Sequence, residues 1–296
     1  TITSIMTLTE LPVISRLSAN IIRILGCNPG PATLQGTNTY LVGTGTRRAL
    51  IDTGEEVTAD KYVQALDQVL KEEKATIQHL ICTHWHNDHI GGVNAVQNLL
   101  KTNSSAEPAT VWKLSRSSDD KERIGLENVI QFELLSDEQL LEVEGAKLRV
   151  KYTPGHTSDH ACLLMEDENA LFSGDCILGE GSSVFSDLLT YMQSLHKILD
   201  MSPSVIYPGH GPVITDPIPS IKYYINNRQE RENQILEVLQ KYGTEKPISE
   251  KDFLDHMYKE NLKPVAAINI NTHLVKLSKE GKVKGDFGAW QFVSKY

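Results

Sequence analysis

Three histidines and an aspartate lie within six residues, and they are side chains suited to binding a metal ion. The run reads HWHNDH from His84 to His89 and follows a short apolar stretch. Imidazole nitrogen and carboxylate oxygen are ligands that Zn²⁺ takes at about 2.0–2.2 Å. His84 and His86 are two residues apart, so in an extended segment they point the same way. Asp88 and His89 are adjacent and diverge unless the chain turns there. The run therefore predicts two neighbouring sites, with His84 and His86 in one and Asp88 and His89 in the other.

Three further donors follow later in the chain, each beside Gly or Pro at the end of an expected strand. They are His156 in TPGHT, Asp175 in FSGD and His210 in YPGHG. Strand-end loops positioned by a rigid sheet are where sites are commonly built. The first predicted site comprises His84, His86 and His156, the second comprises Asp88, His89 and His210, and Asp175 can bridge both. Two ions about 3.5–4 Å apart can activate a shared water and stabilise a leaving oxygen.

Short strands separated by turn residues make up much of the first part of the chain and must position these donors. We predict strands over 39–42, 49–51, 77–83, 111–112, 148–152, 161–165, 170–172 and 205–207, and helices over 58–74, 92–101 and 184–201. Most of the predicted ligands then follow a strand directly.

The pattern changes after His210. A long charged helix is predicted over 217–242, then helices over 248–258 and 266–279, and a β-hairpin over 280–296. Two helices followed by a hairpin are typical of a winged-helix module. We therefore predict an α/β domain over 1–220 and a helical, winged-helix-like domain over 221–296.

The order and spacing of the motifs resemble the metallo-β-lactamase superfamily. The resemblance rests on the HxHxDH run, the Gly-His of His156, the Ser-Gly-Asp of Asp175 and the Pro-Gly-His of His210. It implies an αββα sandwich with the metals at one edge, and two Zn²⁺ per chain held by the seven predicted ligands. Asp52 matches the early motif aspartate of the superfamily, which steadies the HxHxDH loop from behind. His160 lies four residues past His156, and we expect it to support the site rather than to bind metal.

A narrower resemblance is to a branch of this superfamily whose members are mitochondrial endoribonucleases acting on single-stranded RNA. It rests on CNPGP at 27–31, GTNTYLVG at 36–43, IDTGE at 51–55 and FSGDCILG at 172–179. It implies a zinc-dependent endoribonuclease that hydrolyses phosphodiester bonds in single-stranded RNA through a metal-bridging hydroxide, in the mitochondrial matrix. We expect Asp88 to accept the proton of that hydroxide, and Asn38 and Thr39 to line the substrate pocket.

Cys176 bears on the substrate, because true β-lactamases of this fold carry a cysteine at the position of Asp175. Here the cysteine comes one residue later and points to the opposite face of its strand, so antibiotic hydrolysis is not expected as the main activity.

A glyoxalase II-like thioesterase or another small-molecule ester hydrolase remains an alternative function, because the same metals can act on a carbonyl. A non-catalytic scaffold would be recognised by a missing ligand, and an iron-dependent oxygenase would need only one site. The sequence lacks none of the seven ligands.

The composition of the chain argues against several other classes of protein. The chain of 296 residues is 40% hydrophobic and 23% charged, which is ordinary for a globular protein. No apolar run approaches the roughly 18 residues of a membrane span, and no secretory signal is recognised over 1–20, so no membrane partner is expected. The net charge of −9 argues against indiscriminate nucleic-acid binding, although residues 244–296 carry a net of +2. The four cysteines form no CxxC pair and are expected to be reduced. Nothing in the sequence indicates an oligomeric state.

Overall fold

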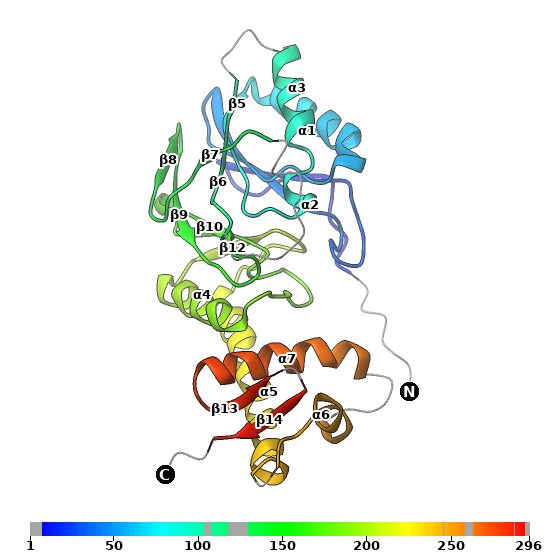
Figure 1. Ribbon diagram of the computed structural model, residues 1–296. Helices are drawn as coiled ribbons and strands as arrows, with labels where there is room; N and C mark the ends of the chain where they lie inside the picture. Colours follow the sequence, from blue (N-terminus) through cyan, green and yellow to red (C-terminus); the bar gives the residue numbers. More distant parts are fainter. Residues whose placement is uncertain are drawn as a thin grey trace.

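Two facing β-sheets form the core of the larger, N-terminal part of the protein (Figure 1). The computed structural model describes residues 8–103, 108–117, 130–244, 246–257, 263–286 and 288–293. Within these ranges the first sheet follows chain order: β1 (Ile14–Arg16), β2 (Ile21–Leu25), β3 (Asn38–Val42), β4 (Arg47–Ile51), β5 (Thr76–Ile81), β6 (Thr110–Lys113) and β7 (Glu133–Leu134). The second sheet has the order β12 (Val205–Pro208), β11 (Ala170–Gly174), β10 (Ala161–Met165), β9 (Ala146–Tyr152) and β8 (Leu140–Val143). Both sheets are mixed, since β4 to β7 and the β11–β12 pair are parallel and the other pairs are antiparallel.

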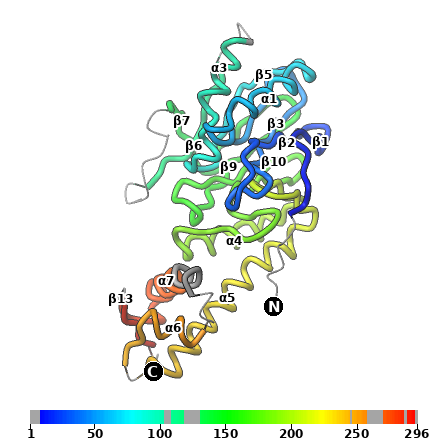
Figure 2. Tube along the Cα trace, turned by 90° about the vertical axis from the view of Figure 1, so that its right-hand side faces the viewer, coloured from blue at the N-terminus to red at the C-terminus, as the bar shows by residue number. Residues whose placement is uncertain are grey.

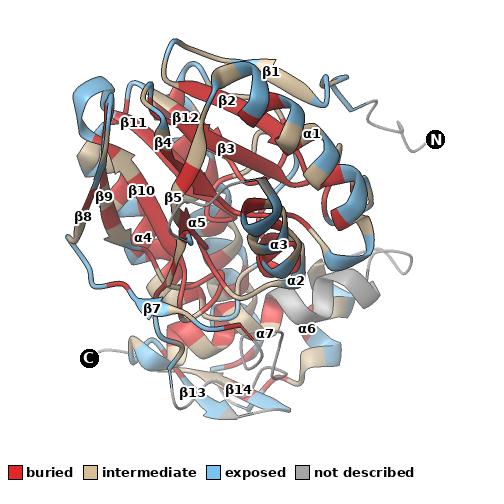
Figure 3. Cartoon of the chain, turned by 90° about the horizontal axis from the view of Figure 1, so that it is seen from above, coloured by how far each residue is buried: buried red, intermediate tan, exposed pale blue. Residues whose placement is uncertain are grey.

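Helices cover the outer face of each sheet, which gives an αββα sandwich. On β3, Tyr40 and Val42 face the second sheet, whereas Leu41 faces outward toward α1 (Ala59–Glu73) and α3 (Val93–Asn103). On the other side, α4 (Leu188–Met201) and the first turns of α5 (Pro217–Tyr242) cover the second sheet. Figure 3 shows the central strands of both sheets buried and the outer faces of the helices exposed. The predicted fold is therefore confirmed.

Most predicted elements of this sandwich are present, with shifts at their ends. Helix α4 begins at Leu188 rather than at residue 184, because the side chain of Asp187 accepts a hydrogen bond from the Thr190 amide and caps the helix. Strands β1, β2, β7 and β8 and the single turn α2 (Asn87–Ile90) were not among the predicted elements. Strand β2 is buried along its whole length, so it shows no alternation of polar and apolar residues.

The C-terminal part packs around its own hydrophobic cluster. It contains α6 (Glu250–Met257), α7 (Lys263–Lys279) and the hairpin of β13 (Val283–Asp286) and β14 (Ala289–Phe292). Residues 1–7, 258, 287 and 294–296, which fall within the predicted N-terminal segment, helix and hairpin, lie outside the described residues. None of the described helices is long and apolar enough to cross a membrane.

Helix α5 joins the two parts as one continuous helix (Figure 2). The boundary predicted between residues 220 and 221 falls inside this helix. Ile221 and Tyr224 pack with α4 and the second sheet, whereas Ile235 and Leu239 pack with α6, α7 and the hairpin. The change of packing partner thus lies between Tyr224 and Ile235, further along the chain than the predicted boundary.

Candidate metal centre

The predicted ligands meet where several strands end at one edge of the sandwich. The HxHxDH run leaves the end of β5 and turns into α2, with His86 still extended at φ −60° and ψ 143°. Asp88 and His89 lie in the helical turn and so face a different point from His84 and His86. The loop between β9 and β10 adds His156, while Asp175 and His210 directly follow β11 and β12.

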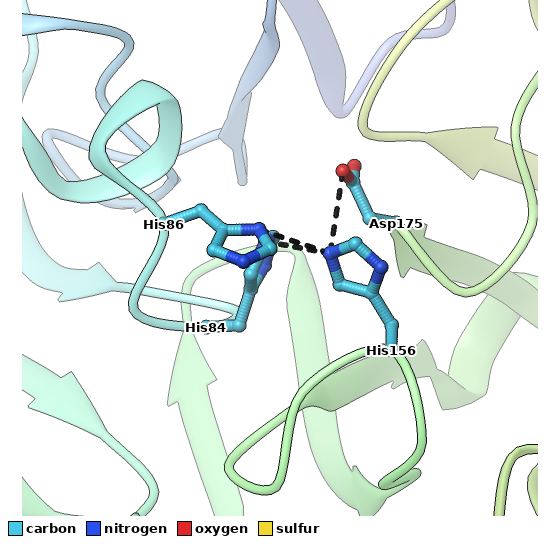
Figure 4. A group of neighbouring side chains, drawn as sticks. All are labelled: His84, His86, His156 and Asp175. Atoms are coloured by element: carbon cyan, nitrogen blue, oxygen red, sulfur yellow. Dashed lines mark hydrogen bonds and ion pairs between the residues drawn. The ribbon is translucent and has the colours of Figure 1, made fainter. Parts of the chain in front are cut away.

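The first donor cluster contains His84, His86 and His156, with Asp175 beside them (Figure 4). Nε2 of His84 lies 2.9 Å from Nδ1 of His86 and 3.2 Å from Nε2 of His156, and the remaining nitrogen pair is 3.0 Å apart. A tetrahedral zinc ion with bonds near 2.05 Å separates its ligands by roughly 3.3 Å. The three nitrogens therefore converge at close to the spacing that a tetrahedral ion requires.

The second donor cluster contains Asp88, His89, His210 and Asp175. Nε2 of His89 lies 3.3 Å from Nε2 of His210, and the two nitrogens lie 3.3 Å and 3.2 Å from Oδ2 of Asp88. This cluster has the same spacing as the first. The structure thus brings all seven predicted ligands together, in the two groups into which the sequence divided them.

Asp175 joins the two clusters. Its Oδ1 lies 3.3 Å from Nε2 of both His89 and His210, and its Oδ2 lies 3.6 Å from Nε2 of His156. Oδ1 is buried and has no hydrogen-bond partner of good geometry among the described residues. A buried carboxylate oxygen needs a compensating partner. A divalent cation in each cluster would supply it, so the donors fit a two-ion site.

Asp52 holds the second cluster from behind. Its Oδ2 lies 2.8 Å from Nδ1 of His89, which leaves Nε2 of that ring facing the cluster. Oδ1 accepts a hydrogen bond from the Thr83 amide at 2.8 Å, at the start of the HxHxDH run. Asp52 has a positive φ of 60° and is 1% exposed. The carboxylate therefore fixes both a ligand ring and the loop that carries it.

Other contacts orient the remaining ligands. Nδ1 of His156 donates to the Val184 carbonyl at 2.8 Å, so its Nε2 is left without a hydrogen and can bind metal. Nε2 of His160 accepts a hydrogen bond from the Asp175 amide at 3.1 Å. His160 is fully buried behind the bridging carboxylate, and its ring belongs to neither donor cluster.

The charges of the site differ between the two clusters. Burial, together with the neighbouring imidazoles, lowers the pKa of His86 to about 4 and that of His84 well below its usual value. Burial also acts to lower the pKa of His210, but Asp175 and Asp88 outweigh it and raise that pKa to about 9. The first cluster is thus a set of neutral nitrogen donors. The second cluster contains two carboxylates, Asp88 and Asp175, which favour a positive charge beside them, either a proton on His210 or a bound cation.

A cavity of about 520 Å³ opens onto both clusters. Metal-binding side chains form its floor and mainly apolar residues form its walls, among them Pro31, Ala32, Leu34, Leu178 and Val184. A substrate can therefore reach the donors from one side.

Asn38 and Thr39 do not line this cavity, contrary to the sequence-based expectation. Both are buried in β3, with exposures of 1% and 0%. The Asn38 amide donates to the carbonyls of Pro208 and Gly211 and so fastens the loop that carries His210. Thr39 accepts a hydrogen bond from the Tyr62 hydroxyl. As neighbours on β3 they face opposite sides of the first sheet, and both sides are covered, so neither side chain reaches the cavity.

One buried ion pair near the site was not foreseen. Nζ of Lys113, at the end of β6, contacts Oδ2 of Asp159, and both residues are buried. Thr157 also donates to Asp159 at 2.7 Å, so the pair fixes the loop between His156 and His160. Asp159 lies between two histidines of a motif, which was the only signal for it. Its partner is 46 residues away in the sequence.

Cys176 is fully buried and packs with α4 on the outer side of the second sheet. It therefore faces away from the donors, as the alternation along the strand predicted. The four cysteines are all free.

Comparison with known proteins shows which family this chain resembles. Residues 32–210 match the family described as the metallo-β-lactamase superfamily. The chain is 48% identical over 277 residues to the β-lactamase-like protein 2 homolog of Drosophila melanogaster, covering 93% of each chain. It is 41% identical over 280 residues to the Caenorhabditis elegans homolog of the same name, covering 94% of this chain and 90% of the relative. It is also similar to an atrochrysone carboxyl ACP thioesterase of Aspergillus fumigatus, with 38% identity, covering 80% of this chain and 70% of the relative.

Solved structures show the same fold. A metallo-β-lactamase family protein from Thermus thermophilus superposes with a TM-score of 0.70 at 22% identity, covering 94% of this chain and 100% of that one. A β-lactamase domain protein from Burkholderia ambifaria superposes with a TM-score of 0.72 at 18% identity, covering 96% of both chains. Because the coverage is nearly complete, the likeness includes the C-terminal part as well as the sandwich.

Proposed function

The chain belongs to the metallo-β-lactamase superfamily, and from this premise we propose that it is a zinc-dependent endoribonuclease that hydrolyses phosphodiester bonds in single-stranded RNA. The observation that carries the proposal is the position of Asp175, whose two oxygens face two adjoining donor clusters. Paired sites of this kind occur in phosphatases, nucleases and other hydrolases.

The donor set determines what bound metal would do. Two divalent ions, when bound, supply an activated water nucleophile at neutral pH and stabilise the charge that develops on the leaving oxygen. His84, His86 and His156 would hold one ion, and Asp88, His89 and His210 the other, with Asp175 shared. Neutral imidazoles in the first cluster and carboxylates in the second make the two sites chemically unequal.

Asp88 is the candidate proton acceptor. Its side chain is 19% exposed and lines the cavity, whereas the side chain of Asp175 is only 12% exposed. Burial acts to raise the pKa of Asp88, but His89 and His210 outweigh it and hold this pKa well below its usual value. The carboxylate is therefore ionised at neutral pH and lies next to the reacting atoms as a proton acceptor of low basicity.

RNA as the substrate and the mitochondrial matrix as the compartment are proposed from the sequence resemblance. The four segments at 27–31, 36–43, 51–55 and 172–179 carry that resemblance. Two of them border the cavity, through Pro31 of the first and Asp175 and Leu178 of the last. Because Cys176 faces away from the donors, the site contains only histidine and aspartate donors, which is expected of the nucleases and thioesterases of the superfamily rather than of its antibiotic hydrolases.

A thioester hydrolase is the second candidate. It is favoured by the similarity to the Aspergillus fumigatus relative named as an acyl carrier protein thioesterase. The apolar walls of the cavity, which include Leu34, Leu178 and Val184, would also suit an acyl chain.

Cleavage of end-labelled single-stranded RNA by highly purified protein tests the proposal, with an acyl thioester and a cephalosporin assayed in parallel. We expect internal cuts in the RNA that a chelator abolishes. Asp175→Ala should abolish them as well, whereas its neighbour variant Cys176→Ala should keep them, since that side chain faces α4. Thioester turnover without RNA cleavage by zinc-loaded protein would refute the nuclease proposal and favour the second candidate.

A further inference from the structure

A second cavity adjoins the metal cavity. It has a volume of about 370 Å³ and lies between the loop 182–185, helix α5 and helix α7. Ser182, Ser183 and Val184 line both cavities, so only this short stretch of chain separates them. The sandwich contributes one wall and the C-terminal part the others. A chain-like substrate bound at the metals could therefore extend into the second cavity.

The buried guanidinium of Arg228 lines this second cavity. Arg228 lies on α5 and is 6% exposed. Its Nη1 donates to the Tyr224 carbonyl at 3.0 Å, and its Nη2 lies 3.2 Å from the Ser182 hydroxyl and 3.3 Å from the Ser183 carbonyl. Its Nε has no hydrogen-bond partner in the described part of the chain.

Among the residues that the structure describes, no carboxylate balances the charge of Arg228. Its hydrogen-bond acceptors are neutral, and no described carboxylate forms an ion pair with it. The rings of Tyr224, Tyr191 and Phe185 surround it at 4.8, 5.1 and 5.5 Å, which offsets part of the desolvation cost. A buried charge without a counter-ion is otherwise expensive.

The buried acid nearest to Arg228 on α5 already forms an ion pair with another residue. Glu232 lies one turn further along α5, with its Oε1 2.7 Å from Nζ of Lys276. Arg231 and Asn227 also line the cavity from α5. The cavity therefore presents cationic and amide groups, while its neighbouring acid is held by a lysine. This composition selects an anion.

We propose that the Arg228 cavity binds a backbone phosphate of the substrate strand, close to the bond that is cut. This inference rests on the proposed function, because it takes the substrate to be RNA. Arg228 would act as a binding residue: it supplies a charged donor next to Ser182 and leaves the chemistry to the metal cavity. Binding a phosphate there would also provide the missing counter-charge for the guanidinium.

Binding of a phosphorothioate single-stranded RNA, which keeps the backbone charge but resists hydrolysis, tests the inference. The affinity of full-length, zinc-loaded protein would be measured by fluorescence anisotropy over a range of salt concentrations. We expect Arg228→Met to weaken binding about 10-fold. The slope of log affinity against log salt should fall by about 0.7, the value for one phosphate contact in a single strand. Arg228→Lys should recover part of both.

Two further variants separate binding from folding. Arg231→Gln changes the same cavity without removing the guanidinium that packs against three rings, and it should also reduce the salt slope. Arg149→Gln removes an arginine on β9 that pairs with Glu166 and lines neither cavity, so it should match wild type. An unfolding midpoint is measured for each variant.

The outcomes distinguish the two proposals. Wild-type RNA cleavage with salt slopes that neither Arg228→Met nor Arg231→Gln changes would overturn the phosphate site and leave the nuclease proposal standing. No RNA binding by wild type would overturn the phosphate site, and with no RNA cleavage the nuclease proposal falls too. Weaker binding with an unchanged salt slope in both cavity variants would mean that Arg228 is only a packing residue, which also overturns the inference.

Discussion

At the scale of single residues, the ligands were predictable from their types and spacing, whereas their supports were not. His84, His86 and His156 converge because three imidazoles sit at strand ends of two facing sheets. Asp52 has no chemical signal of its own beyond a turn after a strand, so only the resemblance assigned it a role. Its contacts with His89 and the Thr83 amide now give that role a physical basis.

Asp52→Ala should weaken metal binding at the second cluster. Loss of the carboxylate frees the His89 ring and the HxHxDH loop, and removal of such a supporting group typically costs about 10–100-fold in metal affinity. Zinc affinity is measured by competition with a coloured chelator. Asp167→Ala, which removes an exposed aspartate, serves as the control. Equal zinc affinity in both variants would contradict the assigned role of Asp52.

The residues that were not predicted from the sequence contact partners that lie far away in the sequence. Lys113 meets Asp159, and Arg228 meets Ser182, 46 residues apart in each case. A single sequence shows the type of each residue but not its partner. Asn38 and Thr39 were misplaced for the same reason: a conspicuous polar motif on a strand can fasten a loop instead of facing a substrate.

At the scale of elements, the loop between β9 and β10 shows how tightly the first cluster is built. Gly155 precedes His156 and has a φ of +130°, where side chains are disfavoured. A Cβ at this position would lie 2.3 Å from the Cα of Tyr191 in α4. The loop can therefore approach the helix only with glycine at this position.

Gly155→Ala should cost about 3 kcal/mol of stability, from the strained φ and the clash with α4 combined. It should also weaken zinc binding, because His156 moves with the loop. Gly181→Ala is the matched control, since that glycine also has a positive φ, +73°, but nothing lies within 4 Å of its Cβ position. The two variants would be compared by urea unfolding and zinc content. Similar losses in both would show that the contact with Tyr191 is unimportant.

The packing of α5 against α7 predicts a pH dependence. Glu232 is buried between Lys276 and His273. Burial acts to raise the pKa of Glu232, but His273 and Lys276 outweigh it and hold this pKa below its ordinary value of 4.5. A pKa lowered in the folded state stabilises the fold above the unfolded pKa, and this contribution is lost as pH falls through the folded pKa.

Glu232→Gln should therefore be less stable than wild type by about 2 kcal/mol at neutral pH. The difference should begin to shrink as pH falls below about 4.5, where Glu232 of the unfolded chain takes up a proton, and should vanish once pH has fallen through the lower pKa of the folded state. Urea unfolding over a pH series measures it. Glu237→Gln, an exposed glutamate on the same helix, should show no such loss. A stability difference that does not vary with pH would rule out the ion-pair explanation.

At the scale of the whole molecule, most elements of the sandwich and the order of the C-terminal helices and hairpin were predictable from periodicity and turn residues. The αββα arrangement itself came from resemblance, because periodicity does not say which sheet a strand joins. The predicted domain boundary at 220/221 falls inside α5, which changes packing partners partway along its length. That change is visible only in the folded chain.

The continuous α5 also links the two cavities. It supplies Arg228 to the second cavity and anchors the C-terminal part beneath the metal cavity through Tyr224, whose hydroxyl accepts a hydrogen bond from the Leu178 amide at 3.1 Å. Leu178 lines the metal cavity. Helix α5 thus contacts residues of both cavities, which agrees with the proposed strand lying across them.

The central claim is that seven side chains form a two-ion hydrolytic centre, and zinc titration of the metal-free, full-length protein tests it most directly. Bound zinc and RNA cleavage would be followed in the same samples, for wild type and for His210→Ala, which removes one donor of the second cluster. We predict that wild type binds two zinc ions per chain, that cleavage rises with the second ion, and that His210→Ala retains one ion and loses cleavage. Full cleavage by wild type with a single bound ion, or by His210→Ala, would contradict the account.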